Sequence, residues 1–97
     1  MNSTHYTQAL FSLGQVVATP AALEALATEG RAADEFISRH VCGDWGDLGA
    51  DDTAENQLSL AEGLRIFSSY VISATLKVWV ITEADRCSTC ILLPSDY

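Results

Sequence analysis

The sequence predicts an α+β fold, a two-layer domain in which three helices pack on a three- to four-stranded antiparallel sheet. Helix start and stop signals recur through the first two thirds of the chain, and the last third is rich in β-branched and aromatic residues. The length of 97 residues and the hydrophobic content of 48% suit one small domain. We expect a flexible N-terminal segment at residues 1–11 and a single domain over residues 12–97.

A short strand and a helix are expected first. Two adjacent valines favour extended backbone within residues 14–19. Thr19 and Pro20 are typical of a helix start, because the threonine hydroxyl can cap and proline suits the first helical position. Gly30 suits the left-handed end of a helix, which places this helix at about 20–29.

Two further helices are predicted before the sheet. Apolar residues at helical spacing indicate a helix over about 32–42 that packs with the first as a helical hairpin. The next helix begins near Asp51 or Asp52 and runs to about Glu62, before Gly63. Its expected inner stripe is Ala54, Leu58 and Ala61, and its expected outer face is Asp52, Glu55, Ser59 and Glu62.

Three strands are expected in the last third, over residues 66–72, 77–82 and 89–93, joined by short polar turns. The middle one is nearly all apolar, so we expect it at the centre of the sheet and covered by helices. Residues 16–19 add a fourth strand at an edge.

The charge distribution is uneven. The chain has 13 acidic and five basic residues, a net charge of −8. Ten acidic residues and only two arginines lie from Glu24 to Glu62, so this segment alone carries the whole excess. Direct nucleic-acid binding needs clustered Lys and Arg, so it is not expected. An acidic surface favours solubility or a basic partner.

The sequence predicts neither a membrane span nor secretion. No run approaches about 18 apolar residues. The first five residues carry no Lys or Arg and no apolar signal core follows, which predicts a cytoplasmic protein.

No motif predicts catalysis. The chain has two histidines, His5 and His40, and lacks both a glycine-flanked nucleophile and a glycine-rich phosphate loop. The aspartates between Asp44 and Asp52 do not follow the spacing of a calcium-binding loop. We therefore expect no enzyme and no cofactor.

A zinc site is an open alternative, with four candidate ligands at His40, Cys42, Cys87 and Cys90. The first two are two positions apart on a predicted helix, and the other two straddle the start of a predicted strand. Neither spacing brings its pair together well, so we favour three packed thiols. A redox role is disfavoured because the first cysteine of the C-x-x-C does not begin a helix.

Three stretches of the chain carry a family resemblance. They are Gly14–Pro20, the loop Gly43–Leu48 (GDWGDL) and the C-terminal run over residues 79–94 (WVITEADR…ILLP). Over about residues 12–97 the chain resembles short proteins of plasmids, integrative elements and phages, often described as plasmid-related. The resemblance implies a mobile-element context and no particular activity.

Charge and resemblance together predict a non-catalytic acidic protein of a mobile element that binds a basic protein surface. In its sharper form, the protein inhibits a nucleic-acid-targeting defence system, of restriction or CRISPR type, by mimicking nucleic-acid charge. The partner would be a nuclease or a subunit of a defence complex. The candidate contacts are Asp44, Asp47, Asp51, Asp52, Glu55 and Glu62.

The main alternative is an accessory interaction module for maintenance or regulation of the element. It would act through the Asp44–Leu48 loop, with Trp45 as an exposed anchor, and through the turn formed by Glu83, Ala84, Asp85 and Arg86. A small zinc-binding protein is the third interpretation. We expect a monomer, or a homodimer formed through the exposed edge strand.

Overall fold

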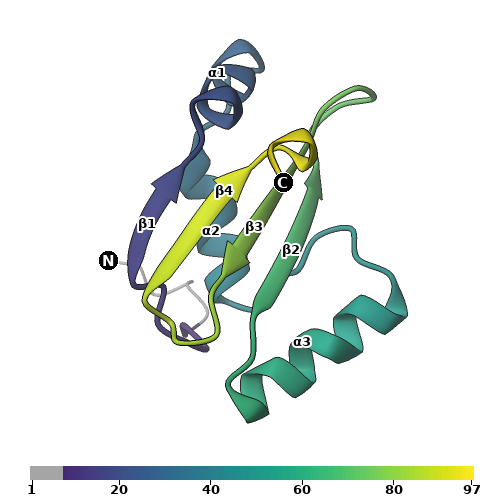
Figure 1. The fold of residues 1–97 in the computed structure, drawn as a ribbon. Coiled ribbons are helices and arrows are strands. Elements are labelled where there is room, and N and C mark those ends of the chain that lie inside the picture. Colours follow the sequence, from purple (N-terminus) through teal and green to yellow (C-terminus); the bar gives the residue numbers. More distant parts are fainter. Residues whose placement is uncertain (1–7) are drawn as a thin grey trace.

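The computed structural model describes residues 8–97 as a four-stranded sheet with three helices packed against it (Figure 1). The helices are α1 (Pro20–Thr28), α2 (Ala33–Val41), α3 (Ala50–Glu62) and a short 3-10 helix, η1 (Pro94–Asp96); the strands are β1 (Gln15–Ala18), β2 (Ile66–Val71), β3 (Lys77–Thr82) and β4 (Ser88–Leu92). The predicted α+β class is confirmed, and each main element lies within two residues of its expected bounds.

The N-terminal segment that was expected to be flexible falls mostly on residues 1–7, which lie outside the described residues. Within the described part, the Leu10 N–H donates to the Val41 carbonyl oxygen at 2.9 Å. The Phe11 ring lies 6.4 Å from the Trp45 ring, centroid to centroid. Residues 10 and 11 are therefore in contact with the domain.

The sheet has the order β1-β4-β3-β2 and is mixed. β2 pairs with β3 and β3 with β4 in antiparallel fashion, but β1 pairs with β4 in parallel. The expectation of a wholly antiparallel sheet is therefore wrong for this one pair. Parallel neighbours need a long connection, and here it comprises the helices and the other two strands. Local patterns identify β1 as a strand but cannot reveal its distant neighbour.

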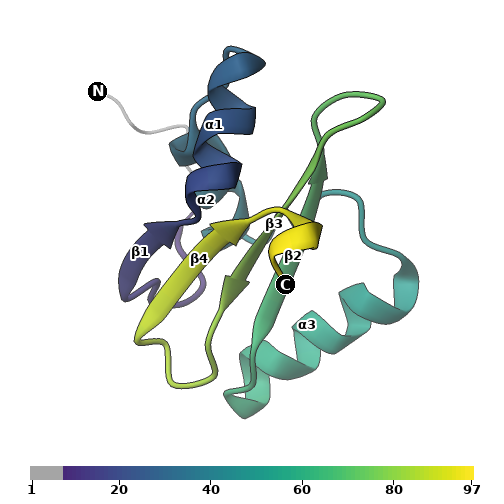
Figure 2. The same cartoon turned by 45° about the horizontal axis from the view of Figure 1, so that its top comes forward.

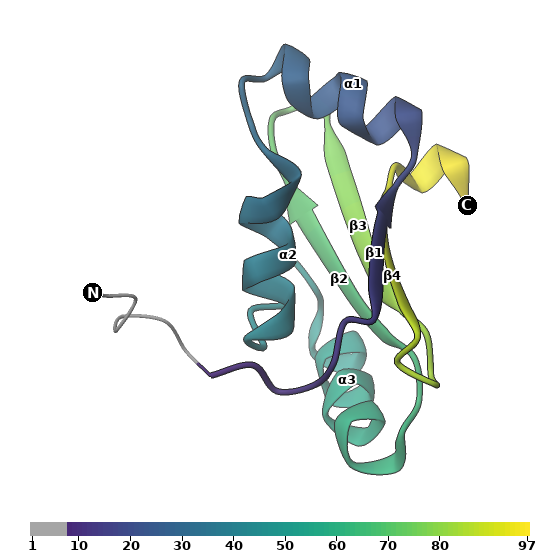
Figure 3. The same ribbon diagram turned by 90° about the vertical axis from the view of Figure 1, so that its left-hand side faces the viewer.

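One face of the sheet forms the core. α2 runs along this face and α1 crosses one end of the sheet (Figure 3). The core residues are Leu26, Phe36, Ile37, Tyr70, Val78, Val80 and Ile91. The expected helical hairpin does not form, because α2 packs its apolar side against the strands, leaving α1 at a steep angle to it (Figure 3). Thr19 caps α1 as predicted, accepting from the Ala22 N–H at 3.1 Å.

β3 lies inside the sheet as expected, but helices α1 and α2 cover only one of its faces. On the opposite face η1 lies near the end of the strands (Figures 1 and 3). Trp79 contacts Phe67 and Tyr97 there, with ring centroids 5.1 and 5.8 Å apart. Within residues 8–97, no helix combines the length and apolar character that crossing a bilayer would require.

Candidate functional site

α3 lies beside β2, at the edge of the sheet (Figure 2). Its Asn56 side chain holds it there. The Asn56 Nδ2 donates to the Phe67 carbonyl oxygen at 2.6 Å, and the Phe67 N–H donates to Asn56 Oδ1 at 3.1 Å. The side-chain amide therefore satisfies both outward backbone groups of Phe67, as a neighbouring strand would.

The expected inner stripe of this helix is wrong. Ala54 and Ala61 are exposed, and Leu58 is 48% exposed. The buried residues are instead Asn56 and Ser59, the second of which was expected on the outer face. The reason is that α3 packs against the polar edge of a sheet, where backbone groups need hydrogen-bond partners, and not against an apolar face.

An acidic flank runs along one side of α3, defined by Asp51, Asp52, Glu55 and Glu62. All four side chains are exposed. At about 100° per residue they fall within roughly 100° of the helix circumference; the buried Ser59 lies within this arc, towards Asp52, and the buried Asn56 lies just beyond it. The helix contains no Lys or Arg. The described residues hold two ion pairs, Arg31–Glu35 and Arg39–Asp44, and neither involves the acidic flank.

Two members of the acidic flank share a surface hollow. Asp52 and Glu55 line it together with Arg65 and Phe67, and its volume is about 280 Å³. The Arg65 side chain donates to the Tyr97 hydroxyl at 2.6 Å, so this guanidinium is held at the C-terminal residue. The structure therefore brings Asp52 and Glu55 together beside one basic residue, while Asp51 and Glu62 lie towards the two ends of α3.

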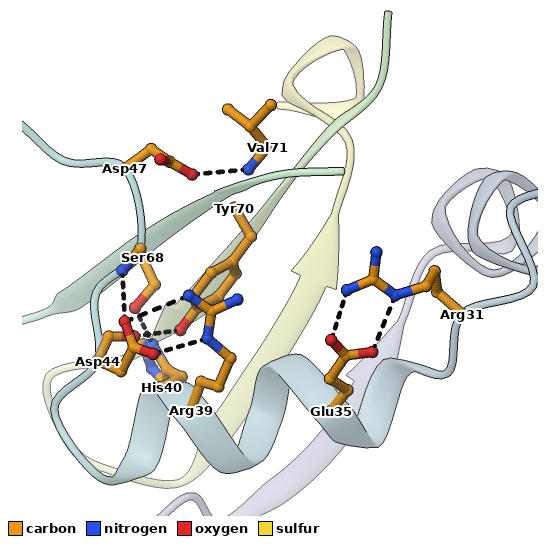
Figure 4. Close-up of polar contacts among 10 residues, drawn as sticks. Arg31, Glu35, Arg39, His40, Asp44, Asp47, Ser68, Tyr70 and Val71 are labelled. Atoms are coloured by element: carbon orange, nitrogen blue, oxygen red, sulfur yellow. Dashed lines mark hydrogen bonds and ion pairs between the residues drawn. The ribbon is translucent and has the colours of Figure 1, made fainter. Parts of the chain in front are cut away.

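The loop Gly43–Leu48 closes the rest of the β2 edge. The Ser69 N–H donates to the Trp45 carbonyl oxygen at 3.1 Å, and the Asp47 N–H donates to the Ser69 carbonyl oxygen at 2.6 Å. The Asp47 Oδ2 accepts from the Val71 N–H at 2.9 Å (Figure 4). With the Asn56 amide, these contacts occupy outward backbone groups of Phe67, Ser69 and Val71, which are every second residue of β2. This edge is therefore not open to another strand.

Contacts around Asp44 fix the shape of this loop. The Asp44 Oδ1 accepts from the Gly46 N–H at 3.1 Å, and its Oδ2 accepts from Arg39 at 2.7 Å (Figure 4). The hydrogen bond from Arg39 holds the pKa of the Asp44 carboxyl below its usual value. The Tyr70 hydroxyl donates to the Asp44 carbonyl oxygen at 2.6 Å. Asp44 and Asp47 thus both have internal structural contacts, although their side chains remain at the surface.

Trp45 is only 6% exposed. Its ring lies 6.0 Å from the His40 ring and stacks at 6.4 Å on Phe11. In this conformation Trp45 is a packing residue and has no exposed ring to anchor a partner.

Arg86 ties the Glu83–Arg86 turn to the end of α3. Its guanidinium donates to the carbonyl oxygens of Leu64 at 2.7 Å and Ser59 at 3.1 Å, and to that of Glu83 at 3.1 Å. The backbone of Arg86 is left-handed, with φ 61°. Because the guanidinium is occupied by backbone oxygens, it is not presented to a partner. Glu83 and Asp85 remain exposed, next to the C-terminal end of α3.

His40 and the cysteines are not assembled into a metal centre. Among residues 8–97, no three His, Cys, Asp or Glu side chains are placed to hold a metal ion. His40 is fully buried, with Nδ1 2.6 Å from Ser68 Oγ and Nε2 2.9 Å from Thr82 Oγ1. Burial lowers the pKa of His40 to about 4, so its ring is neutral at pH 7. Cys42, Cys87 and Cys90 form no disulfide.

Sequence reasoning missed the structural roles of two residues. Asn56 attaches α3 to β2, and Arg86 clamps the Glu83–Arg86 turn to the end of α3. Asn56 interrupts the apolar spacing of α3, which is a faint signal. Nothing near Arg86 in the sequence indicates its contacts with residues 59 and 64.

Comparisons with protein-family models, with curated proteins and with solved structures find no match to this chain. The resemblance to plasmid-related proteins therefore stays a prediction.

Proposed function

We propose that the protein is a non-catalytic binding protein that recognises a basic surface on a protein partner through the acidic flank of α3. The observation that carries the proposal is four exposed carboxylates on a helix without basic residues and without ion pairs in the described part of the chain. Charges that are not neutralised internally attract a basic partner over several ångströms and raise its association rate.

The spacing of the acidic flank supports a partner that otherwise binds nucleic acid. Asp51 and Glu62 are 11 positions apart, which is about 17 Å along a helix axis. Four charges over this length leave three intervals of about 5.5 Å on average, of the same order as the roughly 3.4 Å per charge of a single DNA strand. Glu83 and Asp85, beside the end of α3, add to the same charged end of the molecule.

In the form that the resemblance suggests, the partner is a nuclease or another subunit of a restriction or CRISPR defence complex. The protein would inhibit it by occupying the Lys and Arg side chains that bind phosphates. The loop-based interaction module has weaker support, because Trp45 is buried and the backbone of the Asp44–Leu48 loop is bonded to β2.

The first step of the test is capture of partners by the tagged protein from a host lysate, washed at about 50 mM and about 500 mM salt. A basic partner that is lost at high salt is then purified, and its affinity is measured with two variants. The flank variant is Asp52→Asn/Glu55→Gln/Glu62→Gln. Its matched control, Asp34→Asn/Glu24→Gln/Glu29→Gln, makes the same three chemical changes elsewhere, and both variants change the net charge from −8 to −5.

We expect the flank variant to weaken binding at least about tenfold and to flatten the dependence of log Kd on log salt, while the control changes both much less. Competition with duplex DNA for the partner tests the mimicry itself. Equal weakening by both variants would show that only bulk charge matters and would refute a role for the flank. Unchanged binding by both would refute electrostatic recognition altogether.

A further inference from the structure

The two edges of the sheet differ in how their backbone groups are used. On β2, the outward N–H groups of Phe67, Ser69 and Val71 are all bonded within the molecule. The Gln15 N–H donates inward to the carbonyl oxygen of Cys87, just before β4, at 2.9 Å, and the N–H of Thr19, just after β1, donates to the Ile91 carbonyl oxygen of β4 at 3.0 Å. The alternation of a strand therefore turns the N–H groups of the intervening residues 16 and 18 outward, where no partner lies among the described residues.

The open β1 edge is apolar and uncharged. Val16 and Val17 are 46% and 42% exposed. No Asp, Glu, Lys or Arg precedes Glu24 in the chain, although the protein carries a net charge of −8. Natural sheet edges that must remain unpaired are usually protected by charges, prolines or bulges. The β1 edge has no charged side chain of its own, so a charged peptide would find no complementary charge there.

We infer that β1 pairs in antiparallel fashion with β1 of a second copy, forming a two-fold dimer with one continuous sheet. In the register centred on Val17, Val16 of one copy and Ala18 of the other exchange N–H···O hydrogen bonds, and symmetry doubles the exchange to four bonds. The side chains of the two Val17 residues face each other. Gly14, with φ 64°, and Pro20, which lacks an N–H, bound the ladder.

The closed β2 edge determines where the assembly stops. A sheet with two open edges can add copies without limit, whereas one open and one closed edge allow only a closed pair. Each copy contributes a strand of four residues, so the interface is small. We expect a weak dimer, with a dissociation constant in roughly the micromolar range or above.

The test is sedimentation velocity of the full chain from about 1 to about 500 µM. Val17→Lys places two lysines opposite each other across the two-fold axis, where like charges are unfavourable. Val71→Lys is the matched control, because Val71 is 54% exposed and lies on the same face of the sheet, at the closed edge. Circular dichroism verifies that each variant is folded, and Val16→Lys is a second edge variant.

We expect the wild type and Val71→Lys to dimerise equally, and Val17→Lys to weaken dimerisation at least about tenfold. Val16→Lys, which would lie opposite Ala18 of the second copy, should weaken it less. A wild type that stays monomeric over the whole range would overturn the inference. Growth to species larger than a dimer would overturn it as well, and so would equal effects of Val17→Lys and Val71→Lys. This result is independent of the acidic flank, whose neutralised variant should dimerise at least as well as the wild type.

Discussion

Gly46 offers a sharp test of how the loop closes the β2 edge. Its backbone is left-handed, with φ 76°, and forms a bridge to Ser69. A Cβ added there would lie 2.5 Å from Tyr70 Cδ1 and even closer to the Ser69 carbonyl oxygen. Gly30 has a similar φ of 68°, but a Cβ there would meet no atom within 4 Å. The two positions thus share a backbone conformation and differ in the space around it.

The structure sets a different cost for alanine at each position. Left-handed backbone disfavours alanine by about 1–2 kcal/mol, partly offset by the lower entropy of the unfolded chain. We therefore expect Gly30→Ala to lower the free energy of unfolding by about 1 kcal/mol. At Gly46, overpacking adds about 1–3 kcal/mol. Moving the loop away would also weaken the two backbone hydrogen bonds to Ser69, at about 1 kcal/mol each. Gly46→Ala should therefore cost about 4–6 kcal/mol.

The assay is urea unfolding at pH 7, followed by tryptophan fluorescence, because Trp45 is buried next to the loop. A large difference between the two variants supports the steric argument. Equal destabilisation would refute it, because only the shared φ would then matter. If Gly46→Ala does not fold in buffer alone, Gly46→Ala and Gly30→Ala are compared in a stabilising osmolyte.

Three further predictions concern polar side chains that bond other parts of the fold. Burial lowers the pKa of His40 to about 4, from about 6.5 in the unfolded chain. The neutral buried ring therefore contributes fully to the free energy of unfolding above pH 6.5, and this contribution declines as the pH falls to 4. Urea titrations should show that the free energy of unfolding of the wild type falls by about 3 kcal/mol over this pH interval, and that His40→Gln does not show this fall. The same dependence on pH in that variant would contradict the assignment. Asn56→Ala leaves both backbone groups of Phe67 without their partner, so it should cost about 2–3 kcal/mol in thermal or urea unfolding, whereas exposed Gln57→Ala should change stability by less than about 0.5 kcal/mol. Arg86→Lys cannot reproduce the guanidinium fork, so amide hydrogen exchange at the end of α3 should accelerate several-fold; unchanged exchange would show that the clamp is dispensable.

The element bounds were predictable because their signals are local. Thr19 caps the helix that it was expected to cap, and α2 forms where the helical spacing of apolar residues predicted a helix. In these cases the residues that determine the structure are neighbours in the sequence or lie one helical turn apart.

The placement of α3 was not predictable in the same way. Hydrophobic spacing locates helices that cover an apolar face, but α3 meets the backbone edge of β2. There the amide of Asn56 is more useful than a leucine, and Leu58 points to solvent. The clamp by Arg86 and the parallel pairing of β1 with β4 join residues far apart in the chain, so no local pattern reveals them.

The parallel pairing of the first and last strands also has a consequence during protein synthesis. Val17 lies opposite Cys90 in the sheet, 73 positions later in the chain. At about 5–20 residues per second, a ribosome needs roughly 4–15 s to add these residues. Throughout this time β1 has no native neighbour, although α1, α2 and α3 can form and the β2–β3 hairpin can close. β1 is therefore the last strand to find its native hydrogen-bonded neighbour, and the nascent chain is most vulnerable to mispairing just before β4 is synthesised.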